Sequence, residues 1–332
     1  MQVLVTGGAG FVGGHLVESF ARDGHDVTVL DDFTPYYDVR LKEHNVAVGR
    51  EAAREGGGSY ELVRGDVCDP ETVARVVAPA DVVFHQAAQA GVRTSVDEPR
   101  VVDEINVDGT LNVLDAARDA DVERVVFASS SSVYGVPEYL PYDESHPTLP
   151  VSPYGASKLA AEQYAHAYYQ VYGLPTVSLR YFTVYGPRMR PNMAISNFVS
   201  RCLNGRPPVI YGDGRQTRDF TYVDDVLDAN RRLLDSPVAD GQVINVGSTD
   251  TISVQALAEA VRDAIDPALG IDYRDAAVGD ARHTHADVGK AAQLLGYDPS
   301  TSIREGVARF TDWYRENRDW YEPLVEASAA SA

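Results

Sequence analysis

The chain has 332 residues, with 49 acidic against 29 basic side chains and a formal net charge of −20. Such a field repels phosphate backbones, which disfavours nucleic acid and anionic membrane surfaces as partners. No apolar stretch is long enough to span a bilayer, and the first residues run directly into a strand pattern. The two cysteines, Cys68 and Cys202, lack metal-ligand spacing. We therefore expect a cytoplasmic protein that holds no metal.

Only three lysines accompany the acidic excess. A salt-rich cytoplasm screens the self-repulsion of such a surface and favours it. A genome biased toward arginine codons also explains few lysines, but it does not explain the excess of Asp and Glu. We favour the high-salt interpretation, which concerns the environment and not the activity.

In the first half, short β-branched runs alternate with helical patterns, which predicts a parallel sheet with helices on both faces. The expected strands are 3–5, 26–30, 60–63, 80–85, 124–128 and 176–181, and the expected helices are 10–22, 102–117 and 153–172. Residues 33–59 are polar, end in three glycines and are expected to form a surface excursion. The Ala-Ser-rich tail from Glu326 is expected to fray.

A glycine-rich turn follows the first expected strand and opens a helix. Gly7, Gly10 and Gly13 permit a tight turn and close approach of a pyrophosphate to the helix N-terminus. Gly8, Gly10 and Gly13 also satisfy G-x-G-x-x-G, so spacing leaves the subclass open. Asp31 ends the second strand where the ribose-binding acid of a dinucleotide site is expected, and an acid there favours NAD over NADP.

These patterns predict an α/β fold, a Rossmann-type doubly wound parallel sheet with a smaller C-terminal α/β substrate-binding domain. We place the NAD-binding domain at 1–180 and the mainly substrate-binding domain at 181–332, because the strand-helix rhythm becomes irregular after Gly186-Pro187. The strand pattern at 243–246 is expected to return to the first domain.

Tyr154 and Lys158 lie four residues apart on an expected helix, so both point from one face. An ammonium close to the phenol favours the phenolate and lowers the tyrosine pKa. Beside an oxidised nicotinamide, such a tyrosine could remove a proton from a sugar hydroxyl. A Tyr-x-x-x-Lys pair alone is a weak signal, and the glycine turn upstream gives it weight.

Further motifs accompany these, namely Gly65-Asp66-Val67, His85-Gln86-Ala87-Ala88, Asn106 to Thr110, Ser129 to Gly135 and Arg180-Tyr181-Phe182. With them the whole chain resembles the extended short-chain dehydrogenase/reductase family, and within it the nucleotide-sugar epimerases and dehydratases. The resemblance implies a tightly bound NAD that is regenerated each cycle, a UDP-sugar substrate and a homodimer. The implied cofactor-binding residues are Gly7, Gly10, Phe11, Val12, Gly13, Asp31, Asp32, Asp66, Val67, Ala87, Ala88, Gln89, Asn106, Tyr154, Lys158 and Tyr181.

The serine run separates the reactions of this family. Similar dehydratases carry Thr-Asp-Glu before Val-Tyr-Gly and similar uronate decarboxylases carry Glu before the Val, whereas Ser131 and Ser132 stand here. Without a carboxylate, elimination lacks a local proton shuttle, so oxidation and re-reduction remain, which favours an epimerase. Tyr154 would be the acid/base, Lys158 would bind the nicotinamide ribose, and Ser130 would contact the sugar O4 with Ser132 close by.

The segment from Thr183 to Ala194 resembles the UDP-glucuronate 4-epimerases, whereas many UDP-glucose 4-epimerases have Asn where Thr183 stands. Arg190 would then meet the C6 carboxylate. Two alternatives stay open for Arg190, a loop arginine on the acidic surface or a phosphate ligand. UDP-glucose 4-epimerisation stays open as the alternative function, and a dehydratase or decarboxylase is less favoured.

The resemblance places the rest of the substrate site in the second half. Arg218 and Arg282 match the family's phosphate-binding arginines, Asp280 would take the ribose and Tyr211 would flank the base. Asn197 is a further expected substrate contact. His283 and His285 have no acidic or cysteine partners at ligand spacing, so we expect them to be solvated or hydrogen-bonded and not metal ligands.

Overall fold

A seven-stranded parallel sheet forms the centre of the protein in the computed structural model, which describes residues 1–234, 236–275 and 282–330. The strand order is β11-β6-β5-β4-β1-β2-β3. The strands are β1 (Gln2–Thr6), β2 (Asp26–Asp31), β3 (Tyr60–Arg64), β4 (Val82–His85), β5 (Arg124–Ser130), β6 (Thr176–Tyr181) and β11 (Val243–Val246). The order reverses between β1 and β4, where parallel α/β sheets open a crevice at their carboxyl ends.

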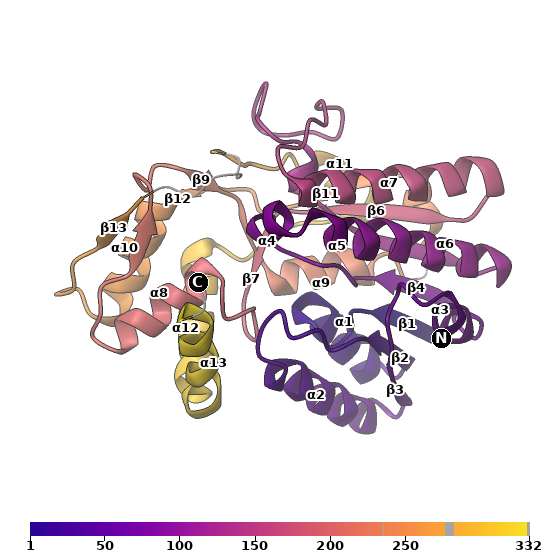
Figure 1. Ribbon diagram of the computed structural model, residues 1–332, viewed down its shortest axis with the longest axis horizontal. Coiled ribbons are helices and arrows are strands. Elements are labelled where there is room, and N and C mark those ends of the chain that lie inside the picture. Colours follow the sequence, from indigo (N-terminus) through magenta and orange to yellow (C-terminus); the bar gives the residue numbers. More distant parts are fainter. Residues whose placement is uncertain (235, 276–281, 331–332) are drawn as a thin grey trace.

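Helices cover both faces of this sheet (Figure 1). Helices α1 (Phe11–Arg22), α2 (Arg40–Gly56) and α9 (Val223–Arg231) pack together on one face, and α3 (Pro70–Val77), α6 (Gly109–Asp119) and α7 (Pro153–Tyr172) on the other. Strands β4 and β5 are buried along their whole length because both of their faces are covered. The predicted Rossmann-type fold is confirmed.

Two predicted segments of the first half differ in the structure. The expected helix 102–117 is divided into α5 (Pro99–Asp103), a π-helical turn (Glu104–Asp108) and α6, and α4 (Val92–Asp97) precedes them. The expected excursion at 33–59 is wrong in its larger part, because residues 40–56 form helix α2. Its buried residues Leu41, Asn45, Ala52 and Ala53 recur at helical spacing, and the helix packs against α1.

The second half builds a separate core between helices α8 (Ala194–Leu203), α10 (Val254–Ile265), α12 (Ile303–Glu316) and α13 (Arg318–Ala330). Three short ladders frame this core: β7 (Thr183–Tyr185) with β10 (Phe220–Tyr222), β8 (Val209–Tyr211) with β13 (Asp272–Arg274), and β9 (Thr217–Arg218) with β12 (Ile252–Ser253). The tail from Glu326 was expected to fray, but it continues α13, which Leu324 and Val325 anchor in this core.

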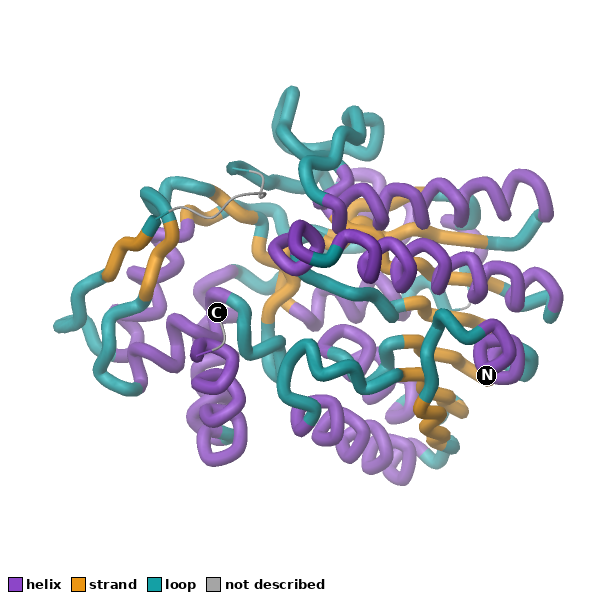
Figure 2. The backbone as a smooth tube through the Cα atoms, in the orientation of Figure 1, coloured by secondary structure: helices purple, strands orange, loops and turns teal. Residues whose placement is uncertain are grey.

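Strand β11 runs parallel to β6 at the edge of the main sheet, so residues 243–246 return to the first half. Helix α11 (Gly289–Leu295) packs beside it. Between β5 and α7, residues 134–152 form a loop that projects from the body of the molecule (Figure 2). None of the helices built by the described residues is long and apolar enough to cross a membrane.

Candidate active site

The glycine turn joins β1 to α1 at the carboxyl edge of the sheet. Gly7 has a φ of +65°, and a Cβ on it would lie 2.7 Å from the backbone nitrogen of Ala87. A Cβ on Gly13 would lie 2.2 Å from the carbonyl oxygen of Gly7. Helix α1 starts at Phe11 after Gly10 without a side-chain cap, so its first N–H groups are open to an anion. The turn is therefore shaped to let a phosphate approach the backbone.

The predicted ribose-binding acids lie beside this turn, but Asp31 is already engaged. Its carboxylate accepts hydrogen bonds from the N–H groups of Ala9 (3.1 Å) and Phe33 (2.9 Å) and from Lys42 Nζ (2.9 Å). Asp32 is more exposed and lies 3.6 Å from the same ammonium. The Lys42 ammonium offsets the charge of Asp31, which weakens the argument that this acid alone repels a 2′-phosphate.

Sequence reasoning missed the residues that brace the turn from α2. Asn45 Nδ2 donates to the carbonyl oxygens of Ala9 (3.0 Å) and Gly10 (2.9 Å). Its Oδ1 accepts from Arg188, a buried residue with a φ of +59° that also pairs with Glu18. The phosphate turn is thereby tied to the loop after β7. No local spacing signals these contacts, because they join distant parts of the chain.

Helix α7 presents Tyr154 and Lys158 one turn apart, directly after its N-cap Ser152. Lys158 is 2% exposed and donates from Nζ to the carbonyl oxygen of Ala128 at 2.9 Å. Burial lowers the pKa of Lys158 to about 7. The ammonium is thus held against the end of β5, where a ribose hydroxyl could also reach it.

Burial raises the pKa of Tyr154, while the Ser130 hydroxyl and the Arg190 charge oppose that rise. The expectation that Lys158 lowers the Tyr154 pKa is wrong for this structure, because the Lys158 ammonium is directed to Ala128 and burial dominates. Arg190 takes the place that sequence reasoning assigned to the lysine as the cation that favours the phenolate.

The serines at the end of β5 have different surroundings. Ser130 is 8% exposed, interacts with Tyr154, and accepts a hydrogen bond from the Ser132 N–H at 3.1 Å. Ser129 donates to Glu162 at 2.7 Å, and this carboxylate also pairs with Arg180. Of the expected serine contacts, Ser130 is therefore the one placed against the phenol, with Ser132 two residues later in the chain.

Asn106 lies in the π-helical turn before α6 and links two of the predicted cofactor segments. Its Nδ2 donates to Ser157 Oγ at 2.9 Å, and its Oδ1 accepts from the Gln89 N–H at 2.8 Å. Such turns occur frequently at functional sites. The contacts connect the loop after β4, which carries Ala87 and Ala88, to the helix of Tyr154.

The other predicted cofactor residues vary in accessibility. Asp66 is exposed and accepts from the Cys68 N–H, and Val67 is buried beside it. The Tyr181 hydroxyl donates to Asn230 at 3.0 Å and accepts from Gln86 at 3.2 Å, so its polar atom is used inside the protein. Phe11 and Val12 are half-buried in the first turn of α1.

Arg190 reaches the same region from the loop after β7. Its guanidinium carbon lies 5.5 Å from the centroid of the Tyr36 ring, and its Nη2 lies 3.5 Å from Met193 Sδ. Within the described residues, no carboxylate comes within 4.0 Å of this guanidinium, and its charge acts on Tyr154. Thr183 is half-buried at the start of β7. An arginine available for an acidic ligand therefore lies beside the phenol.

The remaining predicted substrate residues lie farther along the second half. Asn197 directs its amide to the Met193 carbonyl at 2.9 Å, which makes it a brace of the Arg190 loop. Tyr211 is 42% exposed, with the Arg93 guanidinium 5.2 Å above its ring. Asp280 lies outside the described residues.

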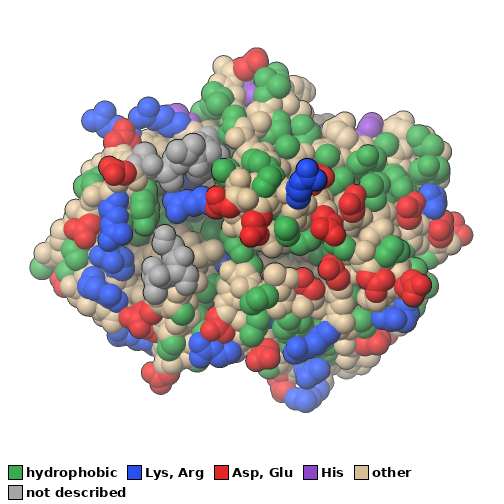
Figure 3. Space-filling model, in the orientation of Figure 1, with side chains coloured by type: hydrophobic (Ala, Val, Ile, Leu, Met, Phe, Trp, Pro, Cys, Tyr) green, Lys and Arg blue, Asp and Glu red, His purple; other side chains and the backbone are tan. Residues whose placement is uncertain are grey.

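The two predicted phosphate arginines lie close together. Arg218 Nη1 donates to the carbonyl oxygens of Thr217 and Arg282, and Arg282 pairs with Asp213 at 2.9 Å on the surface. His283 bonds Thr217 Oγ1 at 2.9 Å. Figure 3 shows basic side chains gathered over this half, whereas acidic side chains prevail over α5 and α6.

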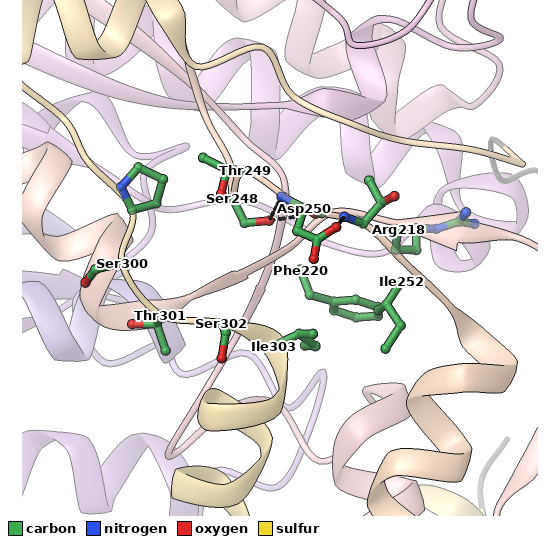
Figure 4. A pocket seen from close by; sticks show the side chains of 12 residues that line it. Arg218, Phe220, Ser248, Thr249, Asp250, Ile252, Ser300, Thr301, Ser302 and Ile303 are labelled. Atoms are coloured by element: carbon green, nitrogen blue, oxygen red, sulfur yellow. Dashed lines mark hydrogen bonds between the residues drawn. The ribbon is translucent and has the colours of Figure 1, made fainter.

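A cavity of about 180 Å³ lies between the loop after β11 and the start of α12, with Phe220, Ser248 and Thr301 in its lining (Figure 4). Arg218 borders it, but its guanidinium points away from the other labelled side chains. The lining includes Arg218 but neither Tyr154 nor Arg190, so this cavity does not contain the candidate reacting groups.

Residues 3–247 match the model of the NAD dependent epimerase/dehydratase family, and the chain belongs to this family. It is 36% identical to a Rhizobium meliloti protein named "Probable UDP-glucuronate 4-epimerase", over 96% of this chain and 98% of that protein. It is also 36% identical to the UDP-glucose 4-epimerase of Mycolicibacterium smegmatis, over 95% of this chain and 99% of that protein. The UDP-glucuronic acid 4-epimerase of Bacillus cereus, solved with UDP-glucuronic acid and NAD, has a TM-score of 0.89 and 32% identity, and covers 95% of this chain and 99% of its own.

The residues present fit the NAD on which this family depends. The positions of Gly7 and Gly13 have no room for a Cβ, and the uncapped start of α1 suits a pyrophosphate. Lys158 and Asn106 lie in the loops and helices that would surround the nicotinamide ribose.

Proposed function

We propose that the protein is an NAD-dependent UDP-glucuronate 4-epimerase that interconverts UDP-glucuronate and UDP-galacturonate. The observation that carries this proposal is Arg190, a half-buried guanidinium beside Tyr154 with no carboxylate partner among the described side chains. A uronate differs from a neutral hexose by one negative charge at C6. A free arginine next to the reacting groups is the residue expected to recognise that charge.

Bound NAD would supply the acceptor and donor for the hydride that leaves and returns at C4 of the sugar. Tyr154, as the phenolate, takes the proton from O4 and later returns it, and Ser130 hydrogen-bonds to the same oxygen. Between these steps the 4-keto sugar turns about its link to the diphosphate and presents its other face. Because both half-reactions use one phenol and one cofactor, the proton and the cofactor are restored each cycle.

The C6 carboxylate of a uronate must be prevented from leaving as CO2 as well as being recognised. Oxidation at C4 of a uronate gives a β-keto acid, which loses CO2 readily. An ion pair with Arg190 holds the negative charge on the carboxylate and opposes its departure. Ser131 and Ser132 stand where similar decarboxylases and dehydratases carry acids, which removes a proton shuttle that would drive the sugar toward elimination.

The diphosphate and nucleoside belong to the second half in this proposal. Arg218 and Arg282 bind the diphosphate, Tyr211 flanks the base and Asp280 binds the ribose, while Thr183 and Asn197 line or brace the sugar site. The Arg218 guanidinium donates to the backbone carbonyl of Arg282, which places the two residues side by side.

The test is NMR of the purified protein with UDP-glucuronate and, separately, with UDP-glucose, without added NAD. Formation of UDP-galacturonate alone supports the proposal and a tightly held cofactor. Conversion of UDP-glucose to UDP-galactose alone overturns the uronate assignment and identifies a neutral-sugar epimerase. A requirement for added NAD overturns only the tight binding.

We further propose a homodimer formed through the helices at 102–117 and 153–172. Tyr164, Val171 and Tyr172 are exposed on α7, and Val96 and Val101 are exposed in α4 and α5, directly before residue 102. We also propose a cytoplasmic protein of a high-salt organism, which the net charge of −20 supports, and a division of the chain at residues 180 and 181. Light scattering and melting temperature across a KCl series test the dimer and the salt requirement.

A further inference from the structure

Tyr36, in the loop after β2, packs against Arg190 although the two are far apart in the sequence. The Arg190 guanidinium carbon lies 5.5 Å from the Tyr36 ring centroid. Both residues act electrostatically on Tyr154, since Arg190 lowers its pKa and Tyr36 raises it. The loop that follows the cofactor acid therefore also supplies a wall beside the reacting phenol.

The Tyr36 ring is held from its other side by the start of α4. Gly91 has a φ of +113°, and a Cβ on it would lie 2.3 Å from the Tyr36 hydroxyl oxygen. Thr94 Oγ1 lies 3.4 Å from the same oxygen. The buried ring of Tyr37 packs edge-on against the Tyr36 ring, with 6.3 Å between the two ring centroids. Tyr36 therefore has neighbours other than Arg190, at its hydroxyl end and beside its ring.

We propose that Tyr36 is a positioning and specificity residue, whose ring holds the Arg190 guanidinium ready for the C6 carboxylate of a uronate. A guanidinium stacks on an aromatic ring through its face and keeps its N–H edge for a carboxylate. A free arginine side chain populates many rotamers, and freezing them on binding costs affinity. Tyr36 would remove much of that cost before the substrate arrives.

This inference rests on the proposed function. It predicts that Tyr36 affects the binding of UDP-glucuronate more than the binding of a UDP-hexose. A UDP-hexose presents a neutral hydroxymethyl group at C6, which gains little from an ordered guanidinium. Loss of the Tyr36 ring should therefore weaken binding of the uronate selectively. Loss of the hydroxyl alone should matter less, because the stacking uses the ring.

The experiment compares Tyr36→Leu and Tyr36→Phe with the wild type and with Tyr139→Leu, a control at a 44% exposed tyrosine of the projecting loop. NMR gives kcat and KM for UDP-glucuronate, calorimetry of the NAD-loaded protein gives Kd for UDP-glucuronate and UDP-glucose, and melting temperature checks folding. We expect Tyr36→Leu to raise the KM and the Kd for UDP-glucuronate about tenfold and the Kd for UDP-glucose less than about threefold. The values for Tyr36→Phe should stay within about threefold of the wild-type values for both UDP-sugars, and the values for Tyr139→Leu should match those of the wild type.

Equal losses on both sugars, or a Tyr36→Phe variant as impaired as Tyr36→Leu, overturn the inference. Failure of the proposed function is a separate result, in which the wild type itself does not convert UDP-glucuronate. In that case calorimetric Kd values of the NAD-loaded wild type and Tyr36→Leu for the two UDP-sugars decide the matter. Selective weakening of UDP-glucuronate binding then supports the inference, and unselective weakening overturns it.

Discussion

The cofactor half and the substrate half hold their functional side chains in different ways. In the cofactor half, the Lys158 ammonium is directed by the main-chain carbonyl of Ala128. In the substrate half, Arg218 also donates to main-chain carbonyls, but the Arg190 guanidinium lies over the Tyr36 ring and Arg282 pairs with the Asp213 side chain on the surface.

This difference separates what the fold determines from what single substitutions can change. Main-chain partners persist whichever side chains surround them, so the groups that serve the reaction stay in place while the sequence varies. Side-chain partners are altered by one substitution, so the groups that choose the sugar are open to adjustment. Reaction type then belongs to the scaffold and substrate preference to the loops.

The largest effect is expected at the phenol of the cofactor half. Tyr154→Phe keeps the ring but removes the hydroxyl proposed to move the O4 proton, so turnover of the UDP-sugar should fall by about 10² to 10⁴. The matched control is Tyr164→Phe on the same helix, where the side chain is 42% exposed. NMR turnover measures both. Equal activity of the two variants would contradict the assignment of Tyr154 as the acid/base.

Rigidity of the glycine turn gives the second test. Gly13→Ala would place a Cβ 2.2 Å from the Gly7 carbonyl oxygen, so we expect a loss of about 1–3 kcal/mol in unfolding free energy and a lower NAD content. At Gly270 no atom lies within 4 Å of an added Cβ, so Gly270→Ala should change stability by less than about 0.5 kcal/mol. Urea unfolding and the absorbance of released cofactor are the measurements. If Gly13→Ala retains NAD normally, the backbone of the turn shifts to accommodate the added Cβ, and the turn is less rigid than we expect.

The contrast between the halves also explains how far the sequence could predict the structure. The main-sheet strands and the helix of Tyr154 follow local signals, namely alternation, glycine spacing and the Ser152 cap. The helix at 40–56 was missed because its sequence is polar and ends in glycines, although one face packs on α1.

Side-chain contacts between segments far apart in the chain could not be predicted from the sequence. Lys42 with Asp31 and Tyr36 with Arg190 each depend on how two segments meet in space. The Tyr154 pKa was expected to be lowered, because spacing reveals a nearby lysine but does not reveal how deeply the phenol is buried. Burial is a property of the packed fold, and here it outweighs the neighbouring charges.

Arg190 of the substrate half acts electrostatically on Tyr154 of the cofactor half. The dependence of kcat/KM on pH tests this coupling. The positive charge of Arg190 lowers the pKa of Tyr154, so Arg190→Leu should raise that pKa. Because the phenolate accepts the O4 proton, the rising limb of kcat/KM against pH should move to higher pH. Arg282→Leu removes an equal charge elsewhere and should leave the limb in place. We would measure UDP-glucuronate turnover across a pH series, and an unmoved limb in Arg190→Leu would contradict the coupling.

The smallest effect is expected at the surface pair of the substrate half. If Arg282 binds the diphosphate as proposed, Asp213 competes for it, so Asp213→Asn should lower the KM for UDP-glucuronate by less than about threefold. The melting temperature should not change, since both side chains are exposed. Added salt should shrink the difference in KM from the wild type, because it screens the pair already.

Arg282→Leu provides the opposite arm of this test and should raise the KM for UDP-glucuronate. If Asp213→Asn also raises the KM, then Asp213 orients Arg282 for the diphosphate and does not compete with it. The substrate half would in that case hold Arg282 in a fixed position as well as Arg218, whose guanidinium donates to two main-chain carbonyls. The contrast between the halves would then apply only to Arg190, at the sugar end of the site.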